Sequence, residues 1–241
     1  MKKTLLTIAF ATIGIFAFAQ KPAAGDKTAE VVLNFQTGTA PISYGLNATA
    51  GMPELRLRYF LANDIAARVR IGLGMSSTDQ KVSDGTTTGN TAEVKTTNGF
   101  GLVIAPGIEK HFAGTAKLSP YYGAELPIAF AGGTTIDVSN ANVAAPTAAD
   151  VNVKNSYKSV SGSKFMIGLN VVMGADYYVL DGLYLGGEMG LGIFQMGSTG
   201  DGTLDMTTGG VAAPQSKILG GSSFNLFGVY TTGGVRLGYK F

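Results

Sequence analysis

PELRLRYFLANDIAARVRIGLG, residues 53–74, is a stretch in which apolar and polar side chains alternate along two runs. The first run contains LRLRY and the second ARVRI, so every second side chain is apolar or aromatic in both. A period of two is typical of a β-strand with one apolar face and one polar face. The Asn63-Asp64 pair between the runs is typical of a tight hairpin. The stretch therefore predicts two antiparallel strands joined by a short turn.

The same alternation recurs along the rest of the chain in about eight segments. Each segment is close to the roughly 9–11 residues that a tilted strand needs to cross a bilayer. Polar or small side chains gather on one face and apolar side chains on the other, as in a barrel with a polar interior and a lipid-facing wall. The predicted strand cores lie at residues 28–37, 53–62, 65–76, 98–112, 119–131, 163–180, 183–196 and 223–241.

Short and long connections alternate between these segments. Asp181-Gly182 forms a second tight turn, and residues 113–118 form a moderately short link. Long stretches rich in Thr, Ser, Gly, Ala and Asn occupy residues 38–52, 77–97, 132–162 and 197–222. We therefore predict an all-β fold, an eight-stranded antiparallel up-and-down transmembrane β-barrel with short periplasmic turns and long extracellular loops.

The N-terminal residues have the pattern of an export signal. Lys2 and Lys3 precede a short apolar run, and Ala17-Phe18-Ala19 resembles a cleavage site. Residues 1–19 are therefore predicted to be a cleaved signal peptide, and residues 20–241 a single outer-membrane barrel domain. The alternative is a retained membrane anchor, for which the run is short, because a spanning helix needs about 20 residues.

Composition narrows the classes of function. The chain has no cysteine, so neither a lipoprotein anchor nor a disulfide framework is expected. Removal of Lys2 and Lys3 with the signal peptide reduces the 18 basic residues to 16, which equals the 16 acidic residues. A neutral chain without a basic cluster offers no electrostatic basis for nucleic-acid binding.

The last strand places apolar or aromatic side chains at every second position and ends on phenylalanine. These side chains belong to Val235, Leu237, Tyr239 and Phe241. A terminal aromatic residue on such a strand resembles the signal that the barrel-assembly machinery reads in outer-membrane proteins. The C-terminal strand therefore predicts a cellular location as well as a shape.

Taken together, these segments resemble the small outer-membrane β-barrel superfamily of Gram-negative bacteria that includes the OmpA transmembrane domain and OmpX. The hairpin at residues 53–74 is especially similar to barrel proteins of Bacteroidetes-type bacteria. The resemblance covers essentially the whole predicted mature chain. It implies a location in the outer membrane, contact with membrane lipid and lipopolysaccharide, and insertion by the barrel-assembly machinery. No peptidoglycan-binding domain follows the barrel, so anchoring to the cell wall is not implied.

Every arginine of the chain falls on the inward phase of its predicted strand. An arginine facing lipid near the bilayer midplane would cost about 2–4 kcal/mol. The arginines are Arg56, Arg58, Arg68, Arg70 and Arg236, and the carboxylates of compatible phase and depth are Glu30, Glu109, Glu125, Asp176 and Glu188. We predict that these ten residues form an ion-pair lattice in the periplasmic half of the lumen, with guanidinium groups that each contact two acceptors. The alternative is that several of these charges meet water at the periplasmic mouth.

The predicted lattice bears on function, because an eight-stranded barrel has an interior that side chains can fill. A filled interior does not conduct, so we expect a structural or surface-interaction role, with any extracellular ligand bound by the loops. The alternative is a narrow porin-like channel for small solutes or ions, lined by the same charges. A lipid-modifying barrel enzyme is a third interpretation. A soluble lipocalin-like carrier would need its apolar face inward.

No catalytic residue, cofactor or metal site is predicted. The single histidine, His111, is expected at the periplasmic rim beside Lys110 and Phe112, whereas barrel enzymes place catalytic groups at the extracellular rim. Neither a phosphate-binding loop nor a GxSxG motif is present. Aromatic residues near the short turns are expected to form an interfacial girdle. They are Tyr59, Phe60, Tyr121, Tyr122, Tyr177, Tyr178, Tyr184, Tyr239 and Phe241.

Overall fold

The computed structural model describes residues 21–37, 53–83, 91–142, 154–208, 211–220, 222–226 and 230–241. The predicted signal peptide, residues 1–19, and the predicted loop at residues 38–52 lie outside the described residues. Within the described ranges the regular elements are strands. No helix in those ranges is long and apolar enough to cross a membrane.

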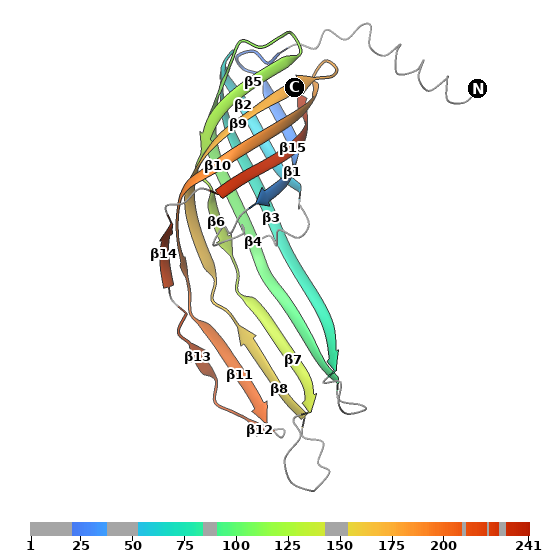
Figure 1. The fold of residues 1–241 in the computed structure, drawn as a ribbon, viewed down its shortest axis with the longest axis vertical. Helices are drawn as coiled ribbons and strands as arrows, with labels where there is room; N and C mark the ends of the chain where they lie inside the picture. Colours follow the sequence, from blue (N-terminus) through green and yellow to red (C-terminus); the bar gives the residue numbers. More distant parts are fainter. Residues whose placement is uncertain are drawn as a thin grey trace, which may run out of the picture.

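A closed ring of antiparallel strand pairs forms the main body of the molecule (Figure 1). Its members are β1 (Lys27–Thr37), β2 (Pro53–Ala62), β3 (Ile65–Ser83), β4 (Thr91–His111), β5 (Leu118–Glu125), β6 (Ile128–Ala131), β9 (Lys164–Tyr178), β10 (Leu183–Thr199) and β15 (Tyr230–Lys240). The order around the ring is β4, β3, β2, β1, β15, β10, β9 and then β5 with β6. Both β5 and β6 pair with β9 on one side and with β4 on the other, which closes the ring.

β5 and β6 are two parts of one wall strand, interrupted at Leu126 and Pro127. Proline has no N–H to donate to a neighbouring strand. The backbone nevertheless stays bonded on both sides, because Leu126 N donates to Pro106 O at 2.8 Å and Gly168 N donates to Pro127 O at 2.9 Å. With β5 and β6 counted together the ring has eight wall strands, so the predicted eight-stranded antiparallel barrel is confirmed.

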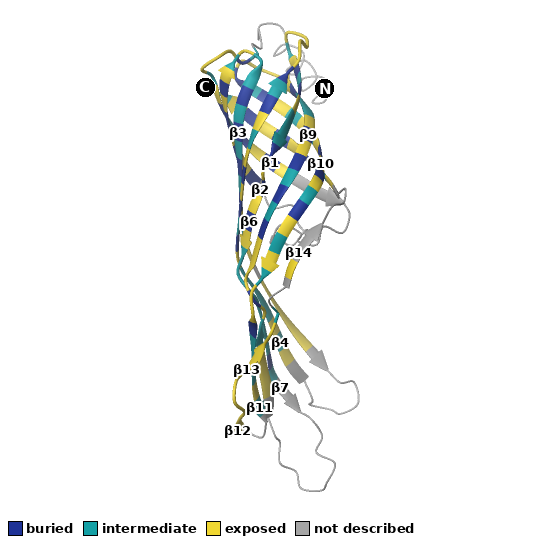
Figure 2. Cartoon of the chain, turned by 90° about the vertical axis from the view of Figure 1, so that its left-hand side faces the viewer, coloured by how far each residue is buried: buried dark blue, intermediate teal, exposed yellow. Residues whose placement is uncertain are grey.

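Alternation along each strand separates the lumen from the outer wall. On β2, Leu55 and Leu57 are exposed on the outside, whereas Arg56 and Arg58 are buried in the lumen. Figure 2 shows the same alternation as bands of buried and exposed residues around the barrel. The apolar face therefore lies outward, as a lipid-facing wall requires.

The long connections contain strands where the sequence analysis expected loops. β3 and β4 continue past the ring paired with each other. β4 then pairs with β7 (Thr134–Asn142), β7 with β8 (Lys154–Val160), and β8 with β11 (Gly202–Thr208). Smaller strands complete this region: β12 (Val211–Ala212) and β13 (Ser216–Ile218) pair with β11, and β14 (Ser222–Leu226) pairs with β10.

We call the outer parts of β3 and β4, together with β7, β8 and β11, the extracellular sheet. It projects from the end of the barrel opposite the C-terminus (Figure 1). These stretches were expected to be loops because they are rich in Thr, Ser and Gly. Threonine is β-branched, however, and favours strands, so a threonine-rich composition does not exclude a sheet.

Two register shifts lie toward the extracellular side of the wall. One falls between Gly74 and Ser76 where β3 pairs with β4, and the other between Gly192 and Phe194 where β10 pairs with β9. An extra residue in a strand reverses the face that later side chains occupy. Beyond the second shift, Gln195 is therefore buried on the inner face of the wall.

Candidate functional site

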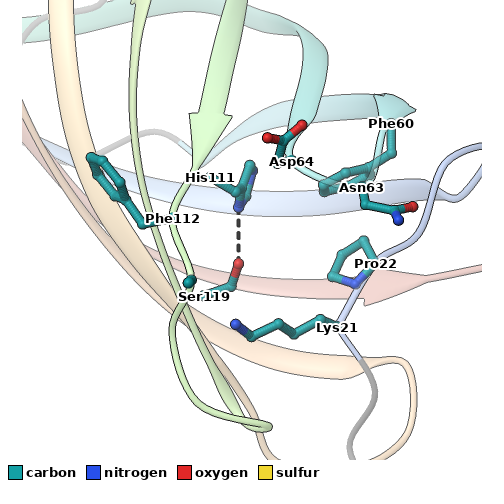
Figure 3. A pocket seen from close by; sticks show the side chains of 9 residues that line it. Lys21, Pro22, Phe60, Asn63, Asp64, His111, Phe112 and Ser119 are labelled. Atoms are coloured by element: carbon teal, nitrogen blue, oxygen red, sulfur yellow. Dashed lines mark hydrogen bonds between the residues drawn. The ribbon is translucent and has the colours of Figure 1, made fainter.

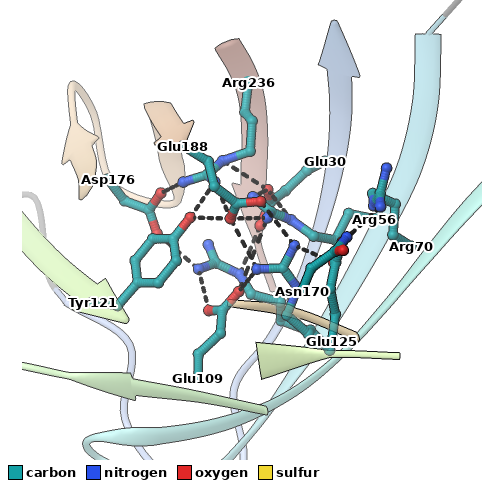
Figure 4. Close-up of polar contacts among 12 residues, drawn as sticks. Glu30, Arg56, Arg70, Glu109, Tyr121, Glu125, Asn170, Asp176, Glu188 and Arg236 are labelled. Carbon is teal, nitrogen blue, oxygen red and sulfur yellow. Dashed lines mark hydrogen bonds and ion pairs between the residues drawn. The ribbon is translucent and has the colours of Figure 1, made fainter. Parts of the chain in front are cut away.

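The ten predicted charged residues all lie in the barrel interior and contact one another (Figure 4). The five arginines are between 0 and 7% exposed. Their carboxylate partners come from β1, β4, β5, β9 and β10, toward the strand ends that are joined by the short turns. Glu54 on β2 joins the same set. We call these eleven residues the ion-pair lattice: Glu30, Glu54, Arg56, Arg58, Arg68, Arg70, Glu109, Glu125, Asp176, Glu188 and Arg236.

Glu188 on β10 accepts hydrogen bonds from three arginines. Arg56 Nη1 lies 2.6 Å from Glu188 Oε2, Arg68 Nη1 lies 2.8 Å from it, and Arg236 Nη1 lies 2.9 Å from it. The Tyr121 hydroxyl donates to the same oxygen at 2.5 Å. Glu188 therefore links β10 to its neighbour β15 and, across the lumen, to β2 and β3.

Glu30 and Glu109 occupy the periplasmic side of the lattice. Glu30 contacts Arg56, lies 2.6 Å from Arg58 Nε, and accepts a hydrogen bond from the Tyr184 hydroxyl at 2.8 Å. Glu109 accepts from Arg58 Nη1 at 3.0 Å and from Arg68 Nη1 at 2.8 Å. Both carboxylates are buried, so these charges are neutralised by guanidinium groups instead of water.

Arg70 and Glu125 lie on the extracellular side of the lattice. Arg70 donates to Glu54 at 2.7 Å and to Glu125 at 2.6 Å, and Asn170 Nδ2 donates to Glu125 at 3.0 Å. Glu54 was absent from the predicted set. Its signal was nevertheless present, because Glu54 occupies the same alternating phase as the inward arginines of β2.

Directly opposite residues on β2 and β3 carry charges of the same sign. Arg56 is opposite Arg70, and Arg58 is opposite Arg68. Like charges in this position are destabilising on an isolated sheet. Here Glu109 on β4 contacts both Arg58 and Arg68, and Glu188 on β10 contacts both Arg56 and Arg68, so carboxylates from other strands of the closed barrel neutralise these guanidinium groups.

The predicted aromatic girdle is wrong for four of its nine members. Phe60, Tyr121, Tyr178 and Tyr184 are between 0 and 1% exposed and point into the lumen. The five others, Tyr59, Tyr122, Tyr177, Tyr239 and Phe241, are between 47 and 64% exposed on the outer wall. Proximity to a turn was used for the prediction, whereas alternation along the strand decides the face.

The inward aromatic rings cover the guanidinium groups. The guanidinium carbon of Arg58 lies 5.3 Å from the ring centre of Tyr184, and that of Arg236 lies 5.2 Å from the ring centre of Tyr121. These distances allow cation–π attraction. Tyr178 and Tyr184 pack together with ring centres 5.0 Å apart.

His111 is the last residue of β4, at the periplasmic rim where the sequence predicted it, and its side chain is buried against the lattice. Its Nδ1 lies 2.9 Å from Ser119 Oγ and its Nε2 lies 3.3 Å from Glu109 Oε2. Ser119, His111 and Glu109 are the residue types of a hydrolytic triad. Glu109 is already bound by two arginines, however, so its charge is engaged in the lattice.

The residues of the predicted assembly signal lie on the outer wall of β15 and at the C-terminus. Val235, Leu237, Tyr239 and Phe241 are all exposed, whereas Arg236 between them is buried in the lattice. The described part of the chain contains no group of three or more His, Asp or Glu residues arranged to hold a metal ion.

The comparisons with known proteins concern the family and the fold. The family described as the putative OmpA-OmpF-like porin family matches residues 42–195. No curated protein matches the sequence.

Several solved structures of outer-membrane proteins are similar. The N-terminal β-barrel domain of Pseudomonas aeruginosa OprF is 12% identical, covers 91% of this chain and 100% of its own, and has a TM-score of 0.41. The Yersinia pestis attachment invasion locus protein Ail is 11% identical, covers 90% and 99%, and has a TM-score of 0.39. A major outer membrane protein from Thermus thermophilus is 14% identical, covers 90% and 100%, and has a TM-score of 0.41.

Proposed function

The chain belongs to the putative OmpA-OmpF-like porin family of outer-membrane β-barrels, and from this premise we propose that it is a non-conducting barrel with a structural or surface-interaction role. The ion-pair lattice closes the lumen, and the extracellular sheet presents the surface available to partners outside the cell. A ligand of that sheet and contact with lipopolysaccharide belong to the same proposal.

The observation that supports closure is that lattice contacts cross the lumen. Arg68 on β3 reaches Glu188 on β10, and Arg58 on β2 reaches Asp176 on β9 at 2.8 Å. The five guanidinium groups, six carboxylates and inward aromatic rings fill the part of the lumen that the lattice spans. An eight-stranded barrel is only wide enough for such side chains, so this part of the lumen has no room for a continuous water column.

The competing function is a narrow channel lined by the same charges. One observation favours it: the side chain of Glu188 is 14% exposed, so the lattice is accessible to water at that point. The lattice would then select ions by charge instead of blocking them.

Planar-bilayer conductance of the refolded, detergent-purified protein separates these functions. A heat-modifiable shift on a gel confirms that the barrel has folded. We expect a folded barrel with no discrete openings, and openings in the Glu188→Ala variant, which removes the carboxylate shared by three arginines. Reproducible openings in the unmodified protein would contradict closure and support the channel.

Export and membrane insertion complete the proposal. Residues 1–19 act as a signal peptide that is removed, and the exposed face of Val235, Leu237, Tyr239 and Phe241 is recognised by the barrel-assembly machinery. N-terminal sequencing of the protein from outer membranes should begin at Gln20. A sequence that begins at Met1 would contradict removal.

A further inference from the structure

A cavity of about 330 Å³ opens at the periplasmic end of the lattice (Figure 3). Its volume lies within the range of small-molecule sites. Phe60 at the end of β2, His111 at the end of β4 and Ser119 at the start of β5 line it, and Lys21 and Pro22 cover it from the segment that precedes β1. The site therefore combines apolar walls with a few polar groups.

The segment that precedes β1 is fixed over this cavity by backbone hydrogen bonds. Gly25 N donates to Phe60 O at 2.8 Å, and Phe60 N donates to Asp26 O at 3.0 Å. Ala24 N donates to the side chain of Asn63 at 3.0 Å. Pro22 is buried as a result. These contacts hold Lys21 at the cavity instead of leaving it free in the periplasm.

The carboxylates around the cavity already have cationic partners. Asp64 is paired with Lys110, whose ammonium hydrogen-bonds it and holds the pKa of that carboxyl below its usual range. Asp26 lies 3.6 Å from Lys240 Nζ, and Glu109, behind His111, is paired with two arginines, as described above.

Lys21, in contrast, lines the cavity without an ion-pair partner among the residues that the structure describes. The lining of the cavity therefore contains one ammonium group that no carboxylate of the described residues pairs with. An anion would supply the missing charge, and a buried or half-buried ammonium binds an oxyanion strongly.

The polar and apolar side chains that line the cavity indicate what kind of anion it can bind. Ser119 is buried and has hydrogen-bonding capacity beyond its contact with His111, because a hydroxyl both donates and accepts. Pro22, Phe60 and Phe112 supply apolar surface. Phe112 also packs on Tyr122 on the outer wall, with ring centres 5.1 Å apart. Exposed aromatic rings of this kind mark the membrane interface, where lipid phosphates lie.

We propose that this cavity binds a phosphate ester, with the phosphate held by the Lys21 ammonium and the Ser119 hydroxyl. Pro22, Phe60 and Phe112 cover the organic part of the ligand. The phosphate belongs either to a phospholipid headgroup of the periplasmic leaflet or to a soluble periplasmic phosphate ester. This site lies on the periplasmic side of the lattice. Its occupation does not depend on whether the barrel conducts.

The test is phosphorus NMR of the refolded protein in dodecyl maltoside, a detergent without phosphate. One arm titrates glycerol 3-phosphate, and the other titrates phosphatidylglycerol added to the micelles. We expect saturable broadening of the phosphorus signal in at least one arm. The Lys21→Gln variant should weaken binding about tenfold, because a charge-assisted hydrogen bond contributes roughly 1.4 kcal/mol or more. Ser119→Ala should weaken it by a smaller factor.

Lys117→Gln is the matched control. Lys117 lies on the same periplasmic rim, in the connection between β4 and β5, but does not line the cavity. Its replacement removes the same charge and should leave binding unchanged. Saturation in the glycerol 3-phosphate arm assigns a soluble ester, and saturation only with phosphatidylglycerol assigns a lipid headgroup. Absence of saturation in both arms, or equal losses in the Lys21 and Lys117 variants, would overturn the site.

Discussion

The barrel interior and the extracellular sheet both carry charges on neighbouring strands, but they pair them differently. In the interior, Arg56 on β2 is opposite Arg70 on β3, so this strand pair presents like charges, whereas Glu30 on β1 is opposite Arg56 on the other side. In the extracellular sheet, one row that crosses five strands alternates in sign at every step. That row consists of Asp79, Lys95, Asp137, Lys158 and Asp205.

The difference follows from the closure of the wall. A residue inside a closed barrel meets side chains from several other strands, so carboxylates on those strands, such as Glu109 and Glu188, can neutralise arginines that are opposite each other. A residue on an open sheet meets only its neighbours and water, so opposite signs must lie on adjacent strands. Burial also changes the energies. An exposed ion pair contributes about 0–1 kcal/mol, whereas the removal of one partner from a buried pair costs about 3–5 kcal/mol.

The largest effect should follow from Arg68→Ala in the lattice. The substitution leaves Glu109, Glu125 and Glu188 each without one cationic partner, and we expect the free energy of unfolding to fall by about 3–5 kcal/mol. Urea unfolding followed by the heat-modifiable gel shift measures the change. Lys95→Ala, which removes a charge from the extracellular sheet, is the control and should change stability by less than about 1 kcal/mol. Equal effects would remove the energetic distinction between the two regions.

A smaller effect should follow from a methyl group added beside the lattice. A Cβ at Gly186 would lie 2.6 Å from Arg236 Nη2 and 2.6 Å from Asp176 Oδ1, so Gly186→Ala should displace this ion pair and cost about 1–3 kcal/mol. Gly187→Ala is the control on the next residue, where a Cβ meets nothing within 4 Å. The same unfolding measurement applies. If the two variants are equally stable, the ion pair of Arg236 and Asp176 can accommodate a methyl group without loss of stability, which would contradict the tight packing of the lattice.

The smallest effect should come from the exposed pair of Lys81 and Glu93. These side chains lie 3.4 Å apart on β3 and β4 and are 77% and 55% exposed. A double-mutant cycle with Lys81→Ala and Glu93→Ala should give a coupling energy below about 1 kcal/mol that decreases further at high salt. A coupling of several kcal/mol would mean that the extracellular sheet is stabilised in the same way as the lumen.

Much of the fold and the lattice could be predicted from alternation alone. A period of two assigns each side chain to one face of a strand, so the inward position of Arg56 and Arg68 is readable from the sequence. The same rule would have placed Glu54 and Phe60 in the lumen, because both share the phase of those arginines. The inward position of Phe60 is therefore contained in the sequence, whereas its proximity to a turn does not decide its face.

Other features depend on backbone geometry that alternation does not contain. The register shift after Gly192 turns Gln195 inward at 1% exposure and Met196 outward at 41% exposure. Continued alternation from Leu191 would give the opposite faces. The threonine-rich connections likewise form strands because β3 and β4 supply an edge with which β7 can pair.

The sequence by itself determined that the chain forms antiparallel strands with an apolar outer face and charged side chains inside, because that pattern is local and repeats every two residues. Only the tertiary structure decided which charges meet. Arg56 and Glu188 are 132 residues apart in the chain and meet at 2.6 Å because closure of the ring brings β2 and β10 to face each other across the lumen. The stagger of the strands around the barrel determines which residues come into contact across the lumen, and this stagger cannot be read from any local pattern of residues.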